Sequence, residues 1–165
     1  MKSVFALVQT LYDGFVKVMN ALQPVLLLAV RIYWGVQLAQ NGWGKLHNLE
    51  RVTGYFASLG LSAPGPTATF VSTVEFVGGI LLAIGLLARI AALAIFIDML
   101  TAYVVADRQA LASIISDPGT FSNGAEFVFF FASLIILIFG PGKISVDTLL
   151  ERLLKRKNQL GAPAV

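Results

Sequence analysis

Acidic side chains stand inside stretches of sequence that are otherwise apolar. Glu75 and Asp98 interrupt two apolar runs that meet at Arg89, within residues 72–105. A carboxylate at membrane depth is costly unless it is paired, faces the interior of a helix bundle or carries a proton. Such carboxylates commonly mark routes for protons or substrates. The rest of the chain must therefore supply partners for these two groups.

The composition is that of a membrane protein. Of the 165 residues, 57% are hydrophobic and 13% are charged, whereas soluble domains carry about 25% charged residues. We expect a single membrane domain over residues 1–165, because no linker long enough to separate two domains is present. The chain has no cysteine and one histidine, His47, which argues against a resident iron–sulfur cluster, a bis-histidine haem or a zinc site.

The pattern of apolar residues predicts an all-α protein with four transmembrane helices. The predicted spans are residues 24–44, 67–88, 90–106 and 124–140. Pro24 suits the start of the first span. Residues 1–22 predict an amphipathic helix on the membrane surface, and residues 148–158 a basic amphipathic helix at the same surface. Residues 107–123 are polar and rich in turn signals, and predict a loop.

The basic residues fix the orientation of this bundle. Most of them fall at one end of the predicted bundle: Lys2, Lys17, Arg89, Lys143, Arg152, Lys155, Arg156 and Lys157. Only Lys45, Arg51 and Arg108 fall at the other end. Since cytoplasmic segments carry the excess of Lys and Arg, both termini are predicted in the cytoplasm. Basic residues beside apolar spans also indicate contact with anionic lipid, and not with nucleic acid.

Depth along the helices predicts which charges meet. At a rise of about 1.5 Å per residue, Arg31 and Asp98 lie at similar depths near the cytoplasmic side, so we expect them to pair. An outer cluster is expected from Asn41, Lys45, Glu75 and Glu126.

These charges permit two interpretations. They either hold the helices in register as structural pairs or handle protons and a bound ligand. On the second interpretation, Glu75, Glu126 and Lys45 are the candidate catalytic groups. Glu75 is the stronger proton carrier, because burial disfavours a charged carboxylate. The candidate ligand-binding positions are Arg31, Asn41, Trp43 and Asp98. Trp43 is expected to serve in packing or as an interfacial anchor, with a quinone platform as the alternative, and Tyr103 is expected at the membrane interface.

Four sequence features occur in an order that resembles the DoxX family of small membrane proteins. They are Arg31 followed by NGWGKL (41–46), EFVGGILLAIGLLARIAAL (75–93), GAEF (124–127) and GPGKISVD (140–147). The resemblance implies a four-helix bundle in the bacterial inner membrane and an association with redox chemistry, through thiosulfate:quinone oxidoreductase and complexes with superoxide dismutase and a sulfurtransferase. Other relatives are linked to maturation factors. In the family pattern, Arg31, Lys45, Glu75 and Glu126 look like the recurrent polar positions, whereas Asp98 is less typical.

Three functions remain open at this point. The first is a membrane subunit of a quinone-linked oxidoreductase, in which a partner carries the electrons because this chain has no cysteine, haem ligands or nucleotide motif. The second is a non-enzymatic scaffold or maturation factor that binds a protein partner through its terminal helices, and a homo-oligomer is also open. The third is a small carrier for protons or solutes, although four spans are few for a transporter.

Overall fold

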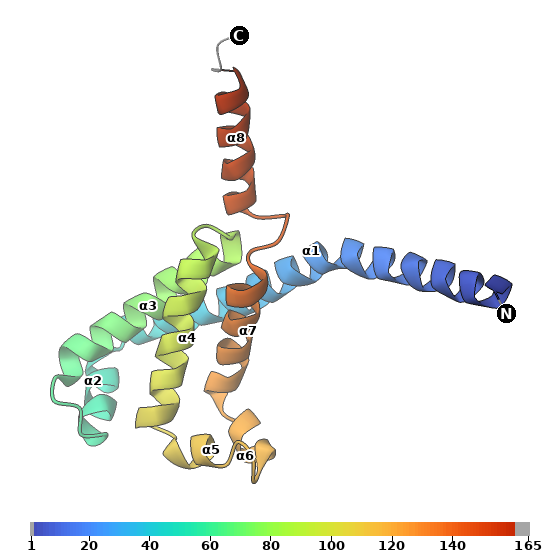
Figure 1. Ribbon diagram of the computed structural model, residues 1–165. Coiled ribbons are helices and arrows are strands. Elements are labelled where there is room, and N and C mark those ends of the chain that lie inside the picture. Colours follow the sequence, from blue (N-terminus) through green and yellow to red (C-terminus); the bar gives the residue numbers. More distant parts are fainter. Residues whose placement is uncertain (1, 161–165) are drawn as a thin grey trace.

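The computed structural model describes residues 2–160, whose regular structure is entirely helical. The helices are α1 (Lys2–Leu46), α2 (Leu49–Ser58), α3 (Pro64–Ile84), α4 (Ala88–Val105), α5 (Arg108–Ala112), α6 (Pro118–Ser122), α7 (Ala125–Phe139) and α8 (Val146–Leu160). Helices α1, α3, α4 and α7 form the body of the bundle, with α2, α5 and α6 at one end (Figure 1). The N-terminal part of α1 and all of α8 leave the bundle at the other end (Figure 1).

Helix α1 is much longer than a membrane crossing requires. Its 45 residues extend over roughly 68 Å, whereas the hydrocarbon core is about 30 Å thick. The helix continues through Pro24, so the break predicted between residues 22 and 24 is absent. A proline inside a helix removes one backbone hydrogen bond and bends the axis, and α1 changes direction before it enters the bundle (Figure 1). Residues 2–23 are named the N-terminal arm below.

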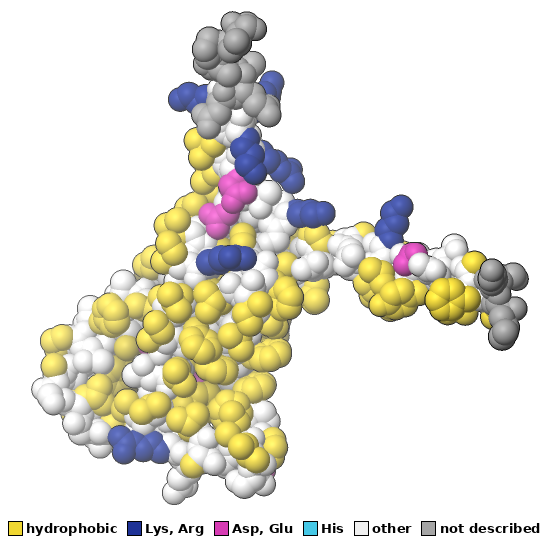
Figure 2. All heavy atoms as spheres, in the orientation of Figure 1, with side chains coloured by type: hydrophobic (Ala, Val, Ile, Leu, Met, Phe, Trp, Pro, Cys, Tyr) yellow, Lys and Arg dark blue, Asp and Glu magenta, His cyan; other side chains and the backbone are white. Residues whose placement is uncertain are grey.

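The N-terminal arm carries an exposed apolar face. Its exposed large apolar residues recur at helical spacing: Val4, Leu7, Leu11, Phe15, Val18 and Leu22. Hydrophobic side chains gather on the side of the arm that is turned toward the bundle, and charged side chains lie on the opposite side (Figure 2). This is how an amphipathic helix lies at a membrane surface. The arm therefore marks the level of the cytoplasmic interface.

Helices α1 and α3 pack with their backbones close together. A Cβ atom built on Gly79 would lie 2.5 Å from the backbone nitrogen of Ala39 and 2.6 Å from the carbonyl oxygen of Gly35. Gly42 is enclosed in the same way by the backbone of Phe76. Only a residue without a side chain fits at these crossings. Close contact of this kind drives helix association in lipid, where the hydrophobic effect between helices is lost.

Helices α4 and α7 complete the bundle around an apolar core. The buried side chains of this core come from four helices: Leu27, Leu38, Leu82, Ala88, Ala92, Ile95, Met99, Phe129 and Ile136. Helix α3 ends where Gly85 adopts the left-handed conformation, with φ 73°. Glycine is favoured at such a position because it has no Cβ penalty. Helix α4 starts shortly after this turn, which makes α3 and α4 antiparallel neighbours.

The segment predicted as a loop at residues 107–123 contains two short helices, so that prediction is wrong. Helix α5 begins after Asp107 and α6 begins after Asp117, and each aspartate side chain accepts a backbone N–H from the helix that it precedes. Aspartate is among the strongest N-cap residues.

Tyr103 was predicted at the membrane interface and is instead fully buried. Its hydroxyl donates a hydrogen bond of 2.8 Å to the carbonyl oxygen of Phe121 in α6, and the two rings stack with their centroids 4.8 Å apart. A buried tyrosine hydroxyl requires such a partner. The contact attaches α6 to α4.

The start of α8 is attached to the turn between α3 and α4. The carboxylate of Asp147 accepts hydrogen bonds from the backbone N–H groups of Leu87 at 2.8 Å and of Ala88 at 2.9 Å. The backbone N–H of Asp147 donates to the carbonyl oxygen of Gly85 at 2.9 Å. Asp147 therefore caps α4 from a helix far away in the sequence, while the rest of α8 projects from the bundle (Figure 1).

The predicted fold class is confirmed. Helices α1, α3 and α4 are long and apolar enough to cross a membrane, and α7 is a shorter apolar helix. The N-terminal arm and α8 leave at the same end, where most of the Lys and Arg side chains gather (Figure 2). By the positive-inside rule that end is cytoplasmic. The end with α2, α5 and α6 therefore faces the other side of the membrane.

Candidate functional site

An ion pair lies at the outer end of the bundle. The Nζ atom of Lys45, in the last turn of α1, donates to Oε1 of Glu75 on α3 at 2.5 Å. The Glu75 side chain is only 5% exposed, whereas that of Lys45 is 38% exposed. The bond therefore joins a buried carboxylate to an ammonium group that reaches it from the rim of the bundle.

Two further carboxyl groups face the same cavity. Asp98 of α4 and Glu126 in the first turn of α7 line it together with Lys45 and Glu75, and its volume is about 130 Å³. This cavity, bounded by these four residues, is named the outer chamber. Oδ2 of Asp98 and Oε2 of Glu75 are buried and receive no hydrogen bond from any residue between positions 2 and 160. Buried oxygens without a donor are rare in native proteins.

Apart from Thr67 and Thr101, the remaining walls of the outer chamber are apolar or aromatic. They include Tyr55 and Phe56 of α2, Leu59 and Leu61 after it, and Met99 of α4. Apolar walls with a few convergent polar groups are typical of small-molecule sites. With three carboxyl groups and one lysine in the chamber, a proton or a hydrogen-bond donor on a ligand would relieve the excess negative charge.

Arg31 and Asp98 do not pair, so that prediction is wrong. Arg31 is completely buried near the cytoplasmic end, and its guanidinium group donates a hydrogen bond to the carbonyl oxygen of Ile144. The same group lies beside Gly85 and is close enough to Asp147 for electrostatic attraction. Asp98 lies instead in the outer chamber. The prediction counted depth from a span that begins at Pro24. Because α1 runs through that position and crosses obliquely (Figure 1), the count overstated the depth of Arg31.

Asn41 and Trp43 also lie outside the outer chamber. Asn41 is exposed, and so is Trp43, whose ring packs against His47 and Phe76 with centroid distances of 4.1 and 5.2 Å. Trp43 lines a shallow apolar groove on the outside of the α1–α3 pair. These contacts favour packing or interfacial anchoring over a ligand platform.

Sequence reasoning missed the aromatic wall and the capping aspartate. Tyr55 and Phe56 belong to residues 46–66, which the sequence predicts as a mildly apolar connector with a short interfacial helix ended by Gly60, and neither residue was assigned to the site. Asp147 lies in the run GPGKISVD, between the helices predicted at residues 124–140 and 148–158, and was assigned no role. Ser145, whose hydroxyl accepts the backbone N–H of Thr148 at 3.2 Å, was a readable signal that a new helix starts there.

The fold and the site define a class: a small multi-pass helical protein with an ion pair and two further carboxyl groups at one end of its bundle. The DoxX family profile matches residues 26–108, which include Arg31, Lys45, Glu75 and Asp98. The chain belongs to the DoxX family, as the resemblance of its motifs predicted.

Two relatives agree with this assignment. The chain is 30% identical to the uncharacterized membrane protein Rv3486 of Mycobacterium tuberculosis over 158 residues, which cover 88% of this chain and 92% of that protein. It is 28% identical to the inner membrane protein YqjF of Escherichia coli K12 over 142 residues, which cover 81% of this chain and 98% of that protein. No solved structure matches. The chain is a multi-pass protein of the bacterial inner membrane, and its helices contact lipid.

Proposed function

We propose that the chain is the membrane subunit of a quinone-linked redox complex and that the outer chamber binds the head group of the quinone. The observation that supports this proposal is the ion pair between Lys45 and the buried Glu75, which lines one cavity with Asp98 and two aromatic side chains. Lys45 supplies a donor for a quinone carbonyl. Glu75 and Asp98 supply acceptors for the hydroxyl groups of the quinol.

The walls suit a flat ring with polar atoms at its edge. Tyr55 and Phe56 offer aromatic surface, and Met99 offers a polarizable contact. The chamber is small, so the apolar tail of the quinone would extend into the lipid beside α2 and α4. Reduction of a quinone takes up two electrons and two protons, and the carboxyl groups of the chamber are placed to deliver the protons.

The electrons come from a partner on this proposal. The chain has no cysteine and a single histidine, so a redox partner of the flavin, haem or iron–sulfur class is required. The role of this chain is then to bind the quinone, orient it and provide protons. Glu126, in the first turn of α7, lies at the rim and connects the chamber with the outer surface.

Binding of a short-chain ubiquinone to the purified protein in lipid nanodiscs tests this proposal. Glu75→Gln and Asp98→Asn should each weaken binding on the order of tenfold or more if a hydrogen bond to a charged group is lost. Glu50→Gln is the matched control, because Glu50 is an exposed carboxylate on α2 outside the chamber. Absence of saturable binding would contradict the proposal. Equal affinity of the wild type, Glu75→Gln, Asp98→Asn and Glu50→Gln would contradict it too.

A scaffold function is a second candidate, and helix α8 favours it. Four leucines of α8 are between 44% and 62% exposed: Leu149, Leu150, Leu153 and Leu154. They form an apolar row on a helix that projects from the bundle (Figure 1). Deletion of residues 148–165 should then abolish recovery of a partner in mild detergent while quinone binding persists. Unchanged recovery would exclude a role for α8 in docking.

A further inference from the structure

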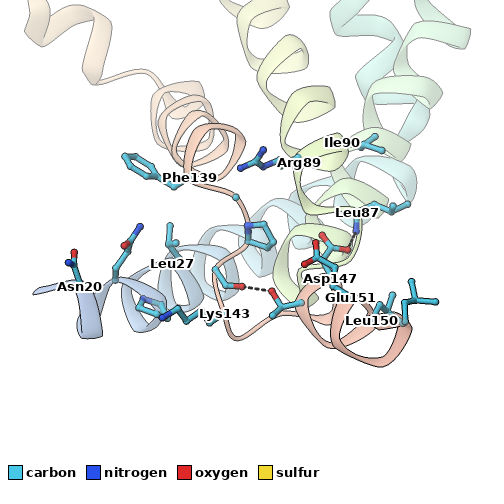
Figure 3. A pocket seen from close by; sticks show the side chains of 17 residues that line it. Asn20, Leu27, Leu87, Arg89, Ile90, Phe139, Lys143, Asp147, Leu150 and Glu151 are labelled. Atoms are coloured by element: carbon cyan, nitrogen blue, oxygen red, sulfur yellow. Dashed lines mark hydrogen bonds between the residues drawn. The ribbon is translucent and has the colours of Figure 1, made fainter. Parts of the chain in front are cut away.

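A second, larger cavity lies at the cytoplasmic end of the bundle. Its volume is about 870 Å³. It is open to the surface and is lined by α1 near Pro24, the first turn of α4, the turn that follows α7 and the first turns of α8 (Figure 3). This inner cavity is separate from the outer chamber, since the two share no lining residue.

Two cations line the inner cavity without a carboxylate partner. Arg89 of α4 and Lys143 of the turn after α7 both border it (Figure 3). Within residues 2–160 neither forms a salt bridge. Arg89 donates one long hydrogen bond of 3.4 Å to the carbonyl oxygen of Ile138 at the end of α7. Most of its donors therefore remain available to an anion, and a guanidinium group matches the geometry of a phosphate.

The two acidic residues of the inner cavity, Asp147 and Glu151, form no salt bridge with these cations. Both carboxylate oxygens of Asp147 accept backbone N–H groups at the start of α4. Glu151 is exposed on α8, one turn further from the bundle. The backbone carbonyl of Asn20 is a further polar group at this cavity. Pro24 has no N–H, so this carbonyl lacks the hydrogen bond that it would receive in a regular helix. That carbonyl can accept a hydrogen bond from a hydroxyl group.

Apolar side chains continue from the inner cavity toward the bundle. Leu27 of α1, Ile90 of α4 and Phe139 of α7 line it together with the two cations, and Ile90 and Phe139 lie level with Arg89 (Figure 3). The N-terminal arm, whose apolar face marks the cytoplasmic interface, leaves the bundle at this level (Figure 2). A ligand in this cavity meets two cations and apolar side chains in one site. A phospholipid combines the two matching parts, a phosphate head group and apolar acyl chains.

We propose that the inner cavity is a binding site for an anionic phospholipid of the cytoplasmic leaflet. Arg89 and Lys143 hold its phosphate, and Leu27, Ile90 and Phe139 contact its acyl chains. The carbonyl of Asn20 accepts from a head-group hydroxyl, as phosphatidylglycerol would provide. The lipid then joins α1, α4 and the start of α8 at the point where the N-terminal arm bends away.

Native mass spectrometry of the delipidated protein tests this site with phosphatidylglycerol, phosphatidylcholine and inorganic phosphate as separate probes. We expect saturable binding of one phosphatidylglycerol, weaker binding of phosphatidylcholine and no displacement by millimolar phosphate. Lys143→Gln should weaken phosphatidylglycerol binding about fivefold, the effect of one Lys or Arg near an anionic head group. Phosphate that binds as well as the lipid would overturn the assignment to a phospholipid.

Controls keep the test specific. Lys155→Gln removes an equally basic residue of α8 that does not line the inner cavity, and it should leave affinity unchanged. Glu151→Gln should strengthen binding, because it removes a like charge from the wall. Arg89→Gln should weaken binding by at least as much as Lys143→Gln. Arg89 also contacts the end of α7, so Arg89→Gln could disturb folding. If Arg89→Gln does not fold, the affinity of Lys143→Gln decides the test. Equal affinity of wild type and Lys143→Gln would overturn the proposal.

Discussion

The Lys45–Glu75 pair gives a quantitative prediction for stability. An ion pair at about 4 Å is worth about 4 kcal/mol at the effective dielectric constant of about 20 found near protein surfaces. The Lys45 side chain is 38% exposed and the Glu75 side chain 5% exposed. Solvent screening at Lys45 and desolvation of Glu75 both reduce the net value. We therefore expect a coupling free energy of about 2 kcal/mol between the two side chains.

A double-mutant cycle measures this coupling. Lys45→Met, Glu75→Gln and the double variant are unfolded with SDS in mixed micelles, and the free energies are compared. Lys45→Met should be the most destabilised, because it leaves a buried carboxylate without its cation. The double variant should recover most of that loss. A parallel cycle on Glu50 and Arg51, which are both exposed and form no ion pair, should show no coupling. Coupling below about 0.5 kcal/mol at Lys45–Glu75 would refute the inference that the ion pair stabilises the fold.

Three further predictions concern other parts of the molecule. Gly79→Ala should destabilise the protein by about 1–3 kcal/mol in the same SDS assay, since its Cβ would overlap the α1 backbone; Gly54→Ala, with no neighbour within 4 Å, should be harmless. Asp147→Ala should cost about 1 kcal/mol through loss of the α4 cap, and Asp147→Asn, which keeps an acceptor, should cost less. Hydrogen bonds from the hydroxyl and backbone N–H of Thr120 lower the pKa of Asp117 below its ordinary 3.8. The stabilising contribution of Asp117 is therefore present above pH 3.8 and is lost as the pH falls through the lower pKa of the folded state. Carboxyl NMR of the wild type, with Asp117→Asn to assign the signal, measures this pKa.

The sequence was sufficient for features that depend on composition and local spacing. The four apolar helices, their orientation and the proximity of Lys45 to Glu75 all follow from residue types near the ends of adjacent spans. Helix tilt is not encoded in such spacing, and it decided the position of Arg31. The tilt of α1 carried Arg31 to the cytoplasmic end, and Asp98 remained with the outer carboxyl groups. The role of Asp147 depended on a contact between distant segments, which no local pattern reveals.

On the proposed function, the apolar side chains between the two ends of the bundle predict the side from which protons reach the outer chamber. Between the two ends of the bundle lie Leu38, Leu82 and Ile95, each at most 2% exposed. Each stands on its helix between the level of the inner cavity and that of the outer chamber. Within the described chain these apolar side chains lie between the two ends, so on the proposed function we expect protons for Glu75 and Asp98 to enter from the periplasmic face.

Cysteine accessibility can test this sidedness, because the chain contains no cysteine of its own. Thr67→Cys, at the wall of the outer chamber, should react with an impermeant maleimide in spheroplasts. Lys143→Cys should react only in inverted vesicles. Leu38→Cys should react in neither preparation, because its side chain is buried between the two sites. Labelling of Leu38→Cys in the folded protein would mean that water passes between the two sites, and a carrier would then explain the charged interior better than a quinone site with access from one side.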